Sequence, residues 1–209
     1  MCSVDAMAFV KSFIVCILSF FVIDLFEVSS QWNVFKESMN EKNFNYSNCN
    51  SSAVPLYVKY LHISPDPIMF GNEVKIDLNM TLDEDAGIDN NSIEVDLSLR
   101  LKTKTGYTEL CQIIGESYCH YNDLCSILKD FMTGKKCPED IRKKFNNTCA
   151  CPFNKGPYNI QGIKVNLTQL SFEVRGTFVL TVNLHEKGKI LGCVEIQFCI
   201  TDCNPLGYR

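Results

Sequence analysis

The 209-residue sequence is poor in the residues on which many enzymes and nucleic-acid-binding proteins depend. It contains three histidines and one tryptophan, and its formal net charge of -4 leaves no excess of basic side chains. Because a nucleic-acid partner requires a basic surface that neutralises phosphates, the composition argues against that class. The sequence also has no G-x-S-x-G, no H-E-x-x-H and no glycine-rich phosphate loop, which are common hydrolase, metalloprotease and nucleotide-binding motifs. We predict that the protein is not an enzyme and requires no cofactor.

The chain also lacks an apolar run long enough to cross a membrane as a helix. Ser12–Ile23 (SFIVCILSFFVI) has only twelve residues, whereas a transmembrane helix needs about 20. Lys11 precedes this run and the small residues 28–30 (VSS) follow it, an arrangement typical of a cleaved signal peptide at 1–30. A signal anchor is the alternative. We expect a protein of the secretory pathway.

Cysteine, by contrast, is abundant, with twelve residues in the chain. Six of them lie between Cys111 and Cys151, and in a secreted chain such a density favours disulfides. A zinc site that recruits His120 beside Cys119 is the alternative, but the paired C-x2-4-C knuckles of such sites are absent, so we predict no metal. Six N-x-S/T sequons predict a glycoprotein; they begin at Asn45, Asn50, Asn79, Asn90, Asn146 and Asn166.

The hydrophobic pattern of the remaining chain is mainly that of β-strands. Apolar side chains occupy every second position in Glu73–Leu82 and Ile93–Leu101, which predicts strands with one buried face. Three further segments are predicted strands, the last two forming a hairpin that turns at 186–189: Leu56–Ile63, Phe178–His185 and Ile190–Ile200.

One segment, Asp123–Met132, is predicted to be a helix, because its apolar residues recur at helical spacing. The expected fold is therefore mainly β, an antiparallel sandwich with one short helix and a disulfide-stapled loop region. From the residues alone, a filled core is the favoured interior of such a sandwich.

The segment Cys125–Ile160 (CSILKDFMTGKKCPEDIRKKFNNTCACPFNKGPYNI) resembles the ganglioside activator family. That family has the same order of a helix, T-G-x-x-C-P, a C-x-C pair and P-F-x-x-G-x-Y. The resemblance extends over Asn48–Ile200 through ISPDPIMFGNEVKIDL, VDLSLRL and GKILGCVEI, the last of which matches the wider ML-type lipid-recognition superfamily. It implies a β-cup, in which two splayed antiparallel sheets hold acyl chains between them.

The resemblance also implies a function. Ganglioside activators are lysosomal proteins that lift glycosphingolipids from membranes and present them to β-hexosaminidase A. The expected partners are therefore a glycosphingolipid or other membrane lipid, the membrane surface and a β-hexosaminidase-like hydrolase. The alternatives are a secreted protein with a phospholipid or sterol cargo, and a glycosylated interaction module with a filled core.

Residue roles follow from the same resemblance. It implies the disulfides Cys49–Cys193, Cys111–Cys119, Cys125–Cys151 and Cys137–Cys149, while Cys199 and Cys203 could bond to each other. The expected membrane-contacting lips contain Lys102, Lys104, Tyr107 and Phe172. The expected lining of the lipid cavity is Ile76, Leu78, Met80, Val95, Leu97, Leu99, Phe153, Phe178, Leu180 and Val182. The expected organisation is a signal peptide (1–30), a poorly ordered polar leader (31–47), the lipid-binding domain (48–203) and a tail (204–209).

Overall fold

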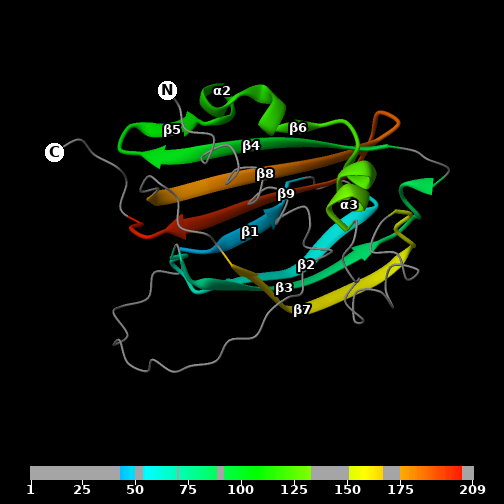
Figure 1. Cartoon of the computed structure of the whole chain (residues 1–209), viewed down its shortest axis with the longest axis horizontal. Coiled ribbons are helices and arrows are strands. Elements are labelled where there is room, and N and C mark those ends of the chain that lie inside the picture. The colour runs from blue at the N-terminus through cyan, green and yellow to red at the C-terminus, as the bar shows by residue number, and fades with distance from the viewer. Residues whose placement is uncertain are drawn as a thin grey trace.

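A computed structural model describes residues 43–49, 54–69, 71–88, 92–132, 151–166 and 175–203. Figure 1 shows two layers of strands, with short helices beside them. In chain order the elements are β1 (Asn45–Asn48), β2 (Leu56–Ser64), β3 (Glu73–Leu82), β4 (Ile93–Thr103), β5 (Gly106–Glu109), α2 (Cys111–Ile114), the 3-10 helix η2 (Glu116–Tyr118), β6 (His120–Tyr121), α3 (Leu124–Met132), β7 (Gly156–Asn166), β8 (Gly176–Glu186) and β9 (Lys189–Ile200).

The strands form two sheets. The larger sheet has the order β1-β9-β8-β4-β5, with β6 also paired to β4, and the smaller has the order β2-β3-β7. All pairings between these strands are antiparallel. The predicted class, a mainly β antiparallel sandwich with little helix, is therefore confirmed. The described part of the chain contains no helix with the length and apolar character needed to span a bilayer.

The alternating segments form strands close to their predicted bounds. Strand β3 covers the predicted residues and buries every second side chain. The predicted turn between β8 and β9 has Lys187 and Gly188 at φ values of 52° and 74°. Two central residues with positive φ are the mark of a type I′ hairpin, whose twist matches that of the flanking strands.

Strand β1 corrects the predicted boundary between the leader and the domain. Residues 45–47, expected in a poorly ordered leader, pair with Glu195–Gln197 of β9. The backbone amides of Asn43 and Phe44 also donate to one Asp66 carboxylate oxygen, at 2.9 Å each. The strand was missed because its partner strand stabilises it, whereas its own side chains show no apolar alternation. Residues 31–42 lie outside the described ranges.

The smaller sheet and the helices contain further elements that the sequence pattern does not predict. Strand β7 begins with Gly156 and Pro157 and contains Gly162 where its register shifts, so no continuous period of two is visible. The prediction of a single helix is also incomplete, because α2 and η2 add two short turns. Both lie within the loop closed by the Cys111–Cys119 disulfide.

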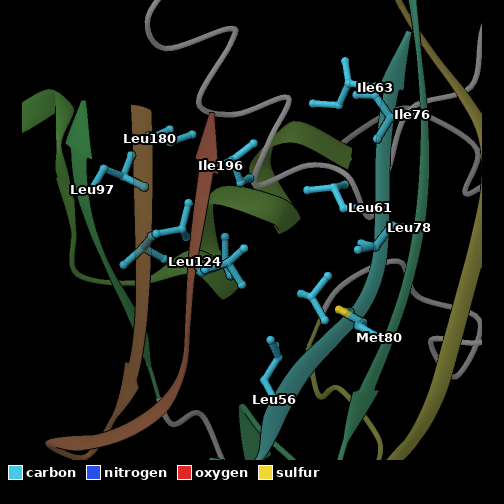
Figure 2. Packing of buried hydrophobic residues seen from close by; sticks show 14 of the residues in the cluster. Leu56, Leu61, Ile63, Ile76, Leu78, Met80, Leu97, Leu124, Leu180 and Ile196 are labelled. Carbon is cyan, nitrogen blue, oxygen red and sulfur yellow. The ribbon is translucent and has the colours of Figure 1, made fainter. Parts of the chain in front are cut away.

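The core lies between the two sheets. Leu61, Leu78 and Met80 of the smaller sheet face Leu97, Leu180 and Ile196 of the larger one (Figure 2). Leu124 and Leu128 of α3 are also buried in this cluster. The interior is therefore an apolar layer that is closed at one end by a helix.

Candidate functional site

The apolar layer between the sheets contains all ten residues predicted to line a lipid cavity. Nine of them are buried, and Leu99 is partly buried against the same cluster. Three come from β3, three from β4 and three from β8, and Phe153 comes from the segment before β7. The structure thus brings the ten together on facing surfaces. Their role in holding a lipid stays a prediction.

A cavity that the described residues form within this layer is small. Its volume is about 30 Å³, roughly the volume that one water molecule occupies in the liquid. Among the predicted residues only Met80 and Phe153 line it. The other lining residues come mostly from the ends of strands, which alternation alone does not single out: Leu56, Leu82, Ala86, Ile93, Leu124, Tyr158, Leu184 and Leu191.

Hydrogen bonds join the edge strand β1 of the larger sheet to the edge strand β2 of the smaller one. We call the four residues that form them the sheet clasp: Tyr46 and Asn48 of β1, and Val58 and Lys59 of β2. The Asn48 amide donates from Nδ2 to the Val58 carbonyl at 2.8 Å, and its Oδ1 accepts from the Val58 amide at 2.9 Å. The Tyr46 hydroxyl donates to the Lys59 carbonyl at 2.8 Å. Since β2 is an edge strand, these side chains satisfy backbone groups that lack a neighbouring strand.

A glycine allows the sheets to approach closely beside the clasp. A Cβ at Gly192 of β9 would lie 2.9 Å from the Leu56 Cβ and 3.0 Å from the Leu56 carbonyl oxygen. Such separations are shorter than van der Waals contact, so a larger side chain here would push β9 away from β2.

Helix α3 covers the end of the sandwich where the β8–β9 hairpin lies (Figure 1). Asp123 caps the helix, because its Oδ1 accepts from the backbone amides of Cys125 and Ser126 at 3.0 and 3.2 Å. The Cys125–Cys151 disulfide links the helix to the segment that carries Phe153. Phe153 and Ala86 exchange two backbone hydrogen bonds, of 2.8 and 2.9 Å. This end is therefore closed by covalent and hydrogen-bonded links.

The apolar side chains of β4 become less buried toward the end of the strand. Ile93 and Val95 at the start of β4 are buried, whereas Leu99 and Leu101 near its end are only partly buried. Beyond them the chain turns through Thr103 into β5. The β4–β5 hairpin thus follows directly on two partly buried apolar side chains of the core.

The β4–β5 hairpin carries three of the four predicted lip residues. Lys104 and Tyr107 are exposed, Tyr107 by 51%, and Lys102 is partly buried. The Arg100 guanidinium lies 5.4 Å from the centre of the Tyr107 ring, a cation–π contact that holds the ring at the surface. Phe172 lies outside the described residues. Ile113 of α2 was missed, although its side chain is 70% exposed. Its exposure has no signal in the sequence, where it stands beside Ile114, which is partly buried.

His120 belongs to an electrostatic cluster on the surface. Its Nδ1 lies 2.5 Å from an Asp96 carboxylate oxygen, and its Nε2 lies 2.8 Å from the Asn122 carbonyl oxygen. The hydrogen bond with Asp96 is the main cause that raises the pKa of His120 above 6.5, and the bond with Asn122 adds to it. His185 approaches the same carboxylate, with Nε2 at 3.5 Å.

Cys119 cannot act as a thiolate ligand for a zinc ion at His120, because it is bonded to Cys111. Within the described ranges no three His, Cys, Asp or Glu side chains gather as metal ligands would.

Four disulfides are present in the described residues. Cys49–Cys193, Cys111–Cys119 and Cys125–Cys151 are pairs that the resemblance implies. Cys199 and Cys203 are bonded to each other as well. Cys137 and Cys149 lie outside the described residues, as do the sequon asparagines Asn50, Asn90 and Asn146. Asn45 is exposed on β1, Asn79 is half-buried on β3, and Asn166 ends β7.

The sequence is similar to a known protein family and to two known proteins. A family model described as "ML domain" matches residues 43–200. The ganglioside GM2 activator of Macaca fascicularis is 26% identical over 160 residues, which cover 74% of this chain and 81% of the relative. That of Mus musculus is 24% identical over 157 residues, covering 73% and 79%.

Among solved structures, a Niemann-Pick type C2 protein from Japanese carpenter ant aligns with a TM-score of 0.40 and 11% identity. The alignment covers 75% of this chain and 99% of that one. This structural likeness is too weak to support an argument about function.

Proposed function

The chain belongs to the ML-domain family, and we propose that it binds a glycosphingolipid, extracts it from membranes and presents the sugar headgroup to a lysosomal glycosidase. Membership of this family supports lipid binding in general, and the named relatives are ganglioside GM2 activators. The disulfides fit a protein of the secretory pathway. In this proposal the protein performs no covalent chemistry itself. The hydrolase, of the β-hexosaminidase type, supplies the catalytic groups.

The observation that carries the proposal is the apolar layer between the two sheets, whose β1 and β2 edges are joined by the sheet clasp. Moving a lipid tail with about 400 Å² of apolar surface from the membrane into water costs about 10 kcal/mol of free energy, at about 25 cal/mol per Å². Burial between the sheets removes that cost, while the polar headgroup remains outside. Extraction therefore requires an apolar site and no catalytic residue.

Lipid binding requires the interior to widen. The cavity of about 30 Å³ is far below the roughly 300–1,000 Å³ of typical ligand pockets. The sheet clasp restrains the edge at β1 and β2, and the disulfide-linked α3 restrains one end. We therefore propose that the lipid enters beside Leu99 and Leu101, which pack against the core but are only partly buried.

The β4–β5 hairpin is the proposed membrane contact. Lys102 and Lys104 would face anionic headgroups, and Tyr107 would lie at the interface, where amphipathic aromatic side chains are favoured. Ile113 adds an exposed apolar side chain next to the hairpin in sequence. The combination suits shallow attachment to an acidic membrane surface.

The first test is lipid analysis of protein purified from a secretory eukaryotic host, followed by transfer of a fluorescent ganglioside between vesicles. We expect about one bound lipid per chain and transfer that depends on the protein. A bound phospholipid or sterol would retain lipid binding and reject the ganglioside cargo. A protein without lipid that also fails to take up labelled lipid would reject the proposal in favour of a filled interaction module.

The membrane contact is tested separately with vesicles that contain an anionic lipid. We expect Tyr107→Ser combined with Lys104→Glu to lower vesicle binding and leave the thermal midpoint nearly unchanged. Tyr57→Ser is the matched control, because Tyr57 is 49% exposed but lies on the smaller sheet. Equal vesicle binding by the double variant and the wild type would reject the β4–β5 hairpin as the contact.

A further inference from the structure

The outer face of the smaller sheet, which is turned away from the apolar layer, carries a polar groove. The groove has a volume of about 470 Å³, and among its lining residues are Tyr60, Asp77, Asn79, Asn159 and Gln161. In Figure 2 the labelled side chains of β2 and β3, such as Leu61 and Leu78, point to the interior. Because side chains alternate along a strand, the residues between them face outward. The proposed lipid site does not use this surface.

Two irregularities in strand pairing shape the groove. In β2 the register shifts between Val58 and Tyr60, so that Lys59 and Tyr60 are both exposed. In β7 an extra residue lies opposite the step from Ile76 to Leu78. There Gly162 adopts a φ of 69°, and its amide donates to Asp77 Oδ1 at 2.6 Å. Bulges of this kind bend a strand and redirect side chains.

The centre of the groove is a cross-strand row formed by Tyr60, Asn79 and Asn159. Tyr60 of β2 is the register partner of Asn79, and Asn79 is the register partner of Asn159 of β7. Directly opposed side chains in an antiparallel sheet lie about 4.5–5.5 Å apart at Cβ. Tyr60 is 51% exposed, and within the described residues no hydrogen bond engages the amide side chains of Asn79 or Asn159.

Asn79 is also the acceptor residue of a glycosylation sequon, Asn79-Met80-Thr81. Met80 is buried in the core, which places Asn79 and Thr81 together on the outward face. The nitrogen that would carry a glycan therefore lies in the polar groove, one strand away from an exposed aromatic ring. On a flat polar surface, a sugar attached to a sequon would have no aromatic ring beside it to pack against.

We propose that the groove is the seat of an N-glycan attached to Asn79, with the first N-acetylglucosamine packed on the Tyr60 ring. The attachment joins Asn79 Nδ2 to C1 of an oligosaccharide supplied as its polyprenyl pyrophosphate. The C1–oxygen bond breaks, the pyrophosphate leaves with the bonding electrons, and the amide nitrogen releases one proton. Asn159 and Gln161 then face the sugar, with amide groups that both donate and accept hydrogen bonds.

Tethering explains why a modest groove suffices. A sugar held by one covalent bond has an effective concentration near the millimolar range for short flexible linkages, so weak stacking and a few hydrogen bonds populate the packed state. A free carbohydrate would need a deeper site for the same occupancy. We therefore assign the groove to the glycan of this chain and not to a soluble sugar.

The test is a double-mutant cycle in protein from a secretory eukaryotic host, with glycopeptide mass spectrometry to verify the glycan on Asn79. We expect Tyr60→Ala to lower the thermal midpoint by about 2–4 °C when the glycan is present, and to have a clearly smaller effect in the Asn79→Gln background. Tyr57→Ala is the control, because Tyr57 has similar exposure on the same strand but does not line the groove. Its effect should be equal in both backgrounds.

A second readout is the rate at which an amidase removes glycans from the folded protein. We expect release from Asn79 to be several-fold slower than release from the exposed Asn45, and Tyr60→Ala to abolish that difference. An unoccupied Asn79, or a Tyr60→Ala effect that is the same with and without the glycan, would overturn the proposal. So would Tyr60-dependent binding of free N-acetylglucosamine to the groove of fully glycosylated protein, because the groove would then be vacant.

Discussion

Replacing Asn48 by alanine tests whether the sheet clasp stabilises the fold. The change removes two hydrogen bonds to Val58, of 2.8 and 2.9 Å, and Val58 itself is buried. Each bond contributes about 0.5–1.5 kcal/mol net, and a backbone group left buried without a partner costs about 1–3 kcal/mol. We expect the free energy of unfolding to fall by about 2–3 kcal/mol, the upper part of what two bonds contribute. For a domain of this size the thermal midpoint should fall by about 4–12 °C.

The assay is equilibrium urea denaturation with the disulfides intact, followed by two independent optical signals to check two-state behaviour. Lys59→Ala is the control, because Lys59 joins the clasp through its backbone carbonyl and its side chain is exposed. We expect that control to stay within about 0.5 kcal/mol of the wild type. If Asn48→Ala and Lys59→Ala have the same small effect, the two sheets are not held together by the hydrogen bonds described here.

Three further outcomes can be checked. The raised pKa of His120 means that its contact with Asp96 stabilises the fold fully below pH 6.5, and that this contribution is lost as the pH rises through the raised value. The thermal midpoint should therefore gain a little from this contact at acidic pH, by a small amount because the site is exposed. The gain should be smaller in Asp96→Asn. Gly192→Ala should destabilise the protein by about 1–3 kcal/mol in urea denaturation, and a neutral result would show that β2 moves aside without cost. Peptide mapping without reduction should join Cys137 to Cys149, and a peptide that joins Cys149 to a different cysteine would contradict the pairing implied by the resemblance.

The strands that the sequence predicts are those whose own side chains carry the information. Strand β3 alternates over ten residues and forms with the predicted bounds. Strands β1 and β6 have four and two residues, too few to show a period, and they form because β9 and β4 offer unpaired backbone groups. In β7 the extra residue beside Gly162 shifts the alternation partway along the strand.

The candidate site was predictable to a similar degree. Alternation identifies which side chains face inward, so the nine predicted lining residues on β3, β4 and β8 lie in or against the core, and Phe153, which precedes β7, is buried there as well. The size of the cavity depends on the spacing between the sheets, which is set by single contacts such as Gly192 against Leu56. Contacts of this kind join residues that are far apart in the sequence, so no local pattern reveals them. The outer groove could not be predicted from the sequence for the same reason, because its lining residues come from three strands that must be paired in register.

The pairing of β1 with β9 has a consequence for the order of biosynthesis. These strands are the first and last of the described domain, and the Cys49–Cys193 disulfide that joins their ends spans a sequence separation of 144. At about 5–20 residues per second, ribosomes need roughly 7–29 s to make that stretch. During this interval Cys49 has no native partner, while other cysteines emerge beside it. The native Cys49–Cys193 bond therefore cannot form until most of the domain has been synthesised, and any disulfide that Cys49 forms earlier must be exchanged for it.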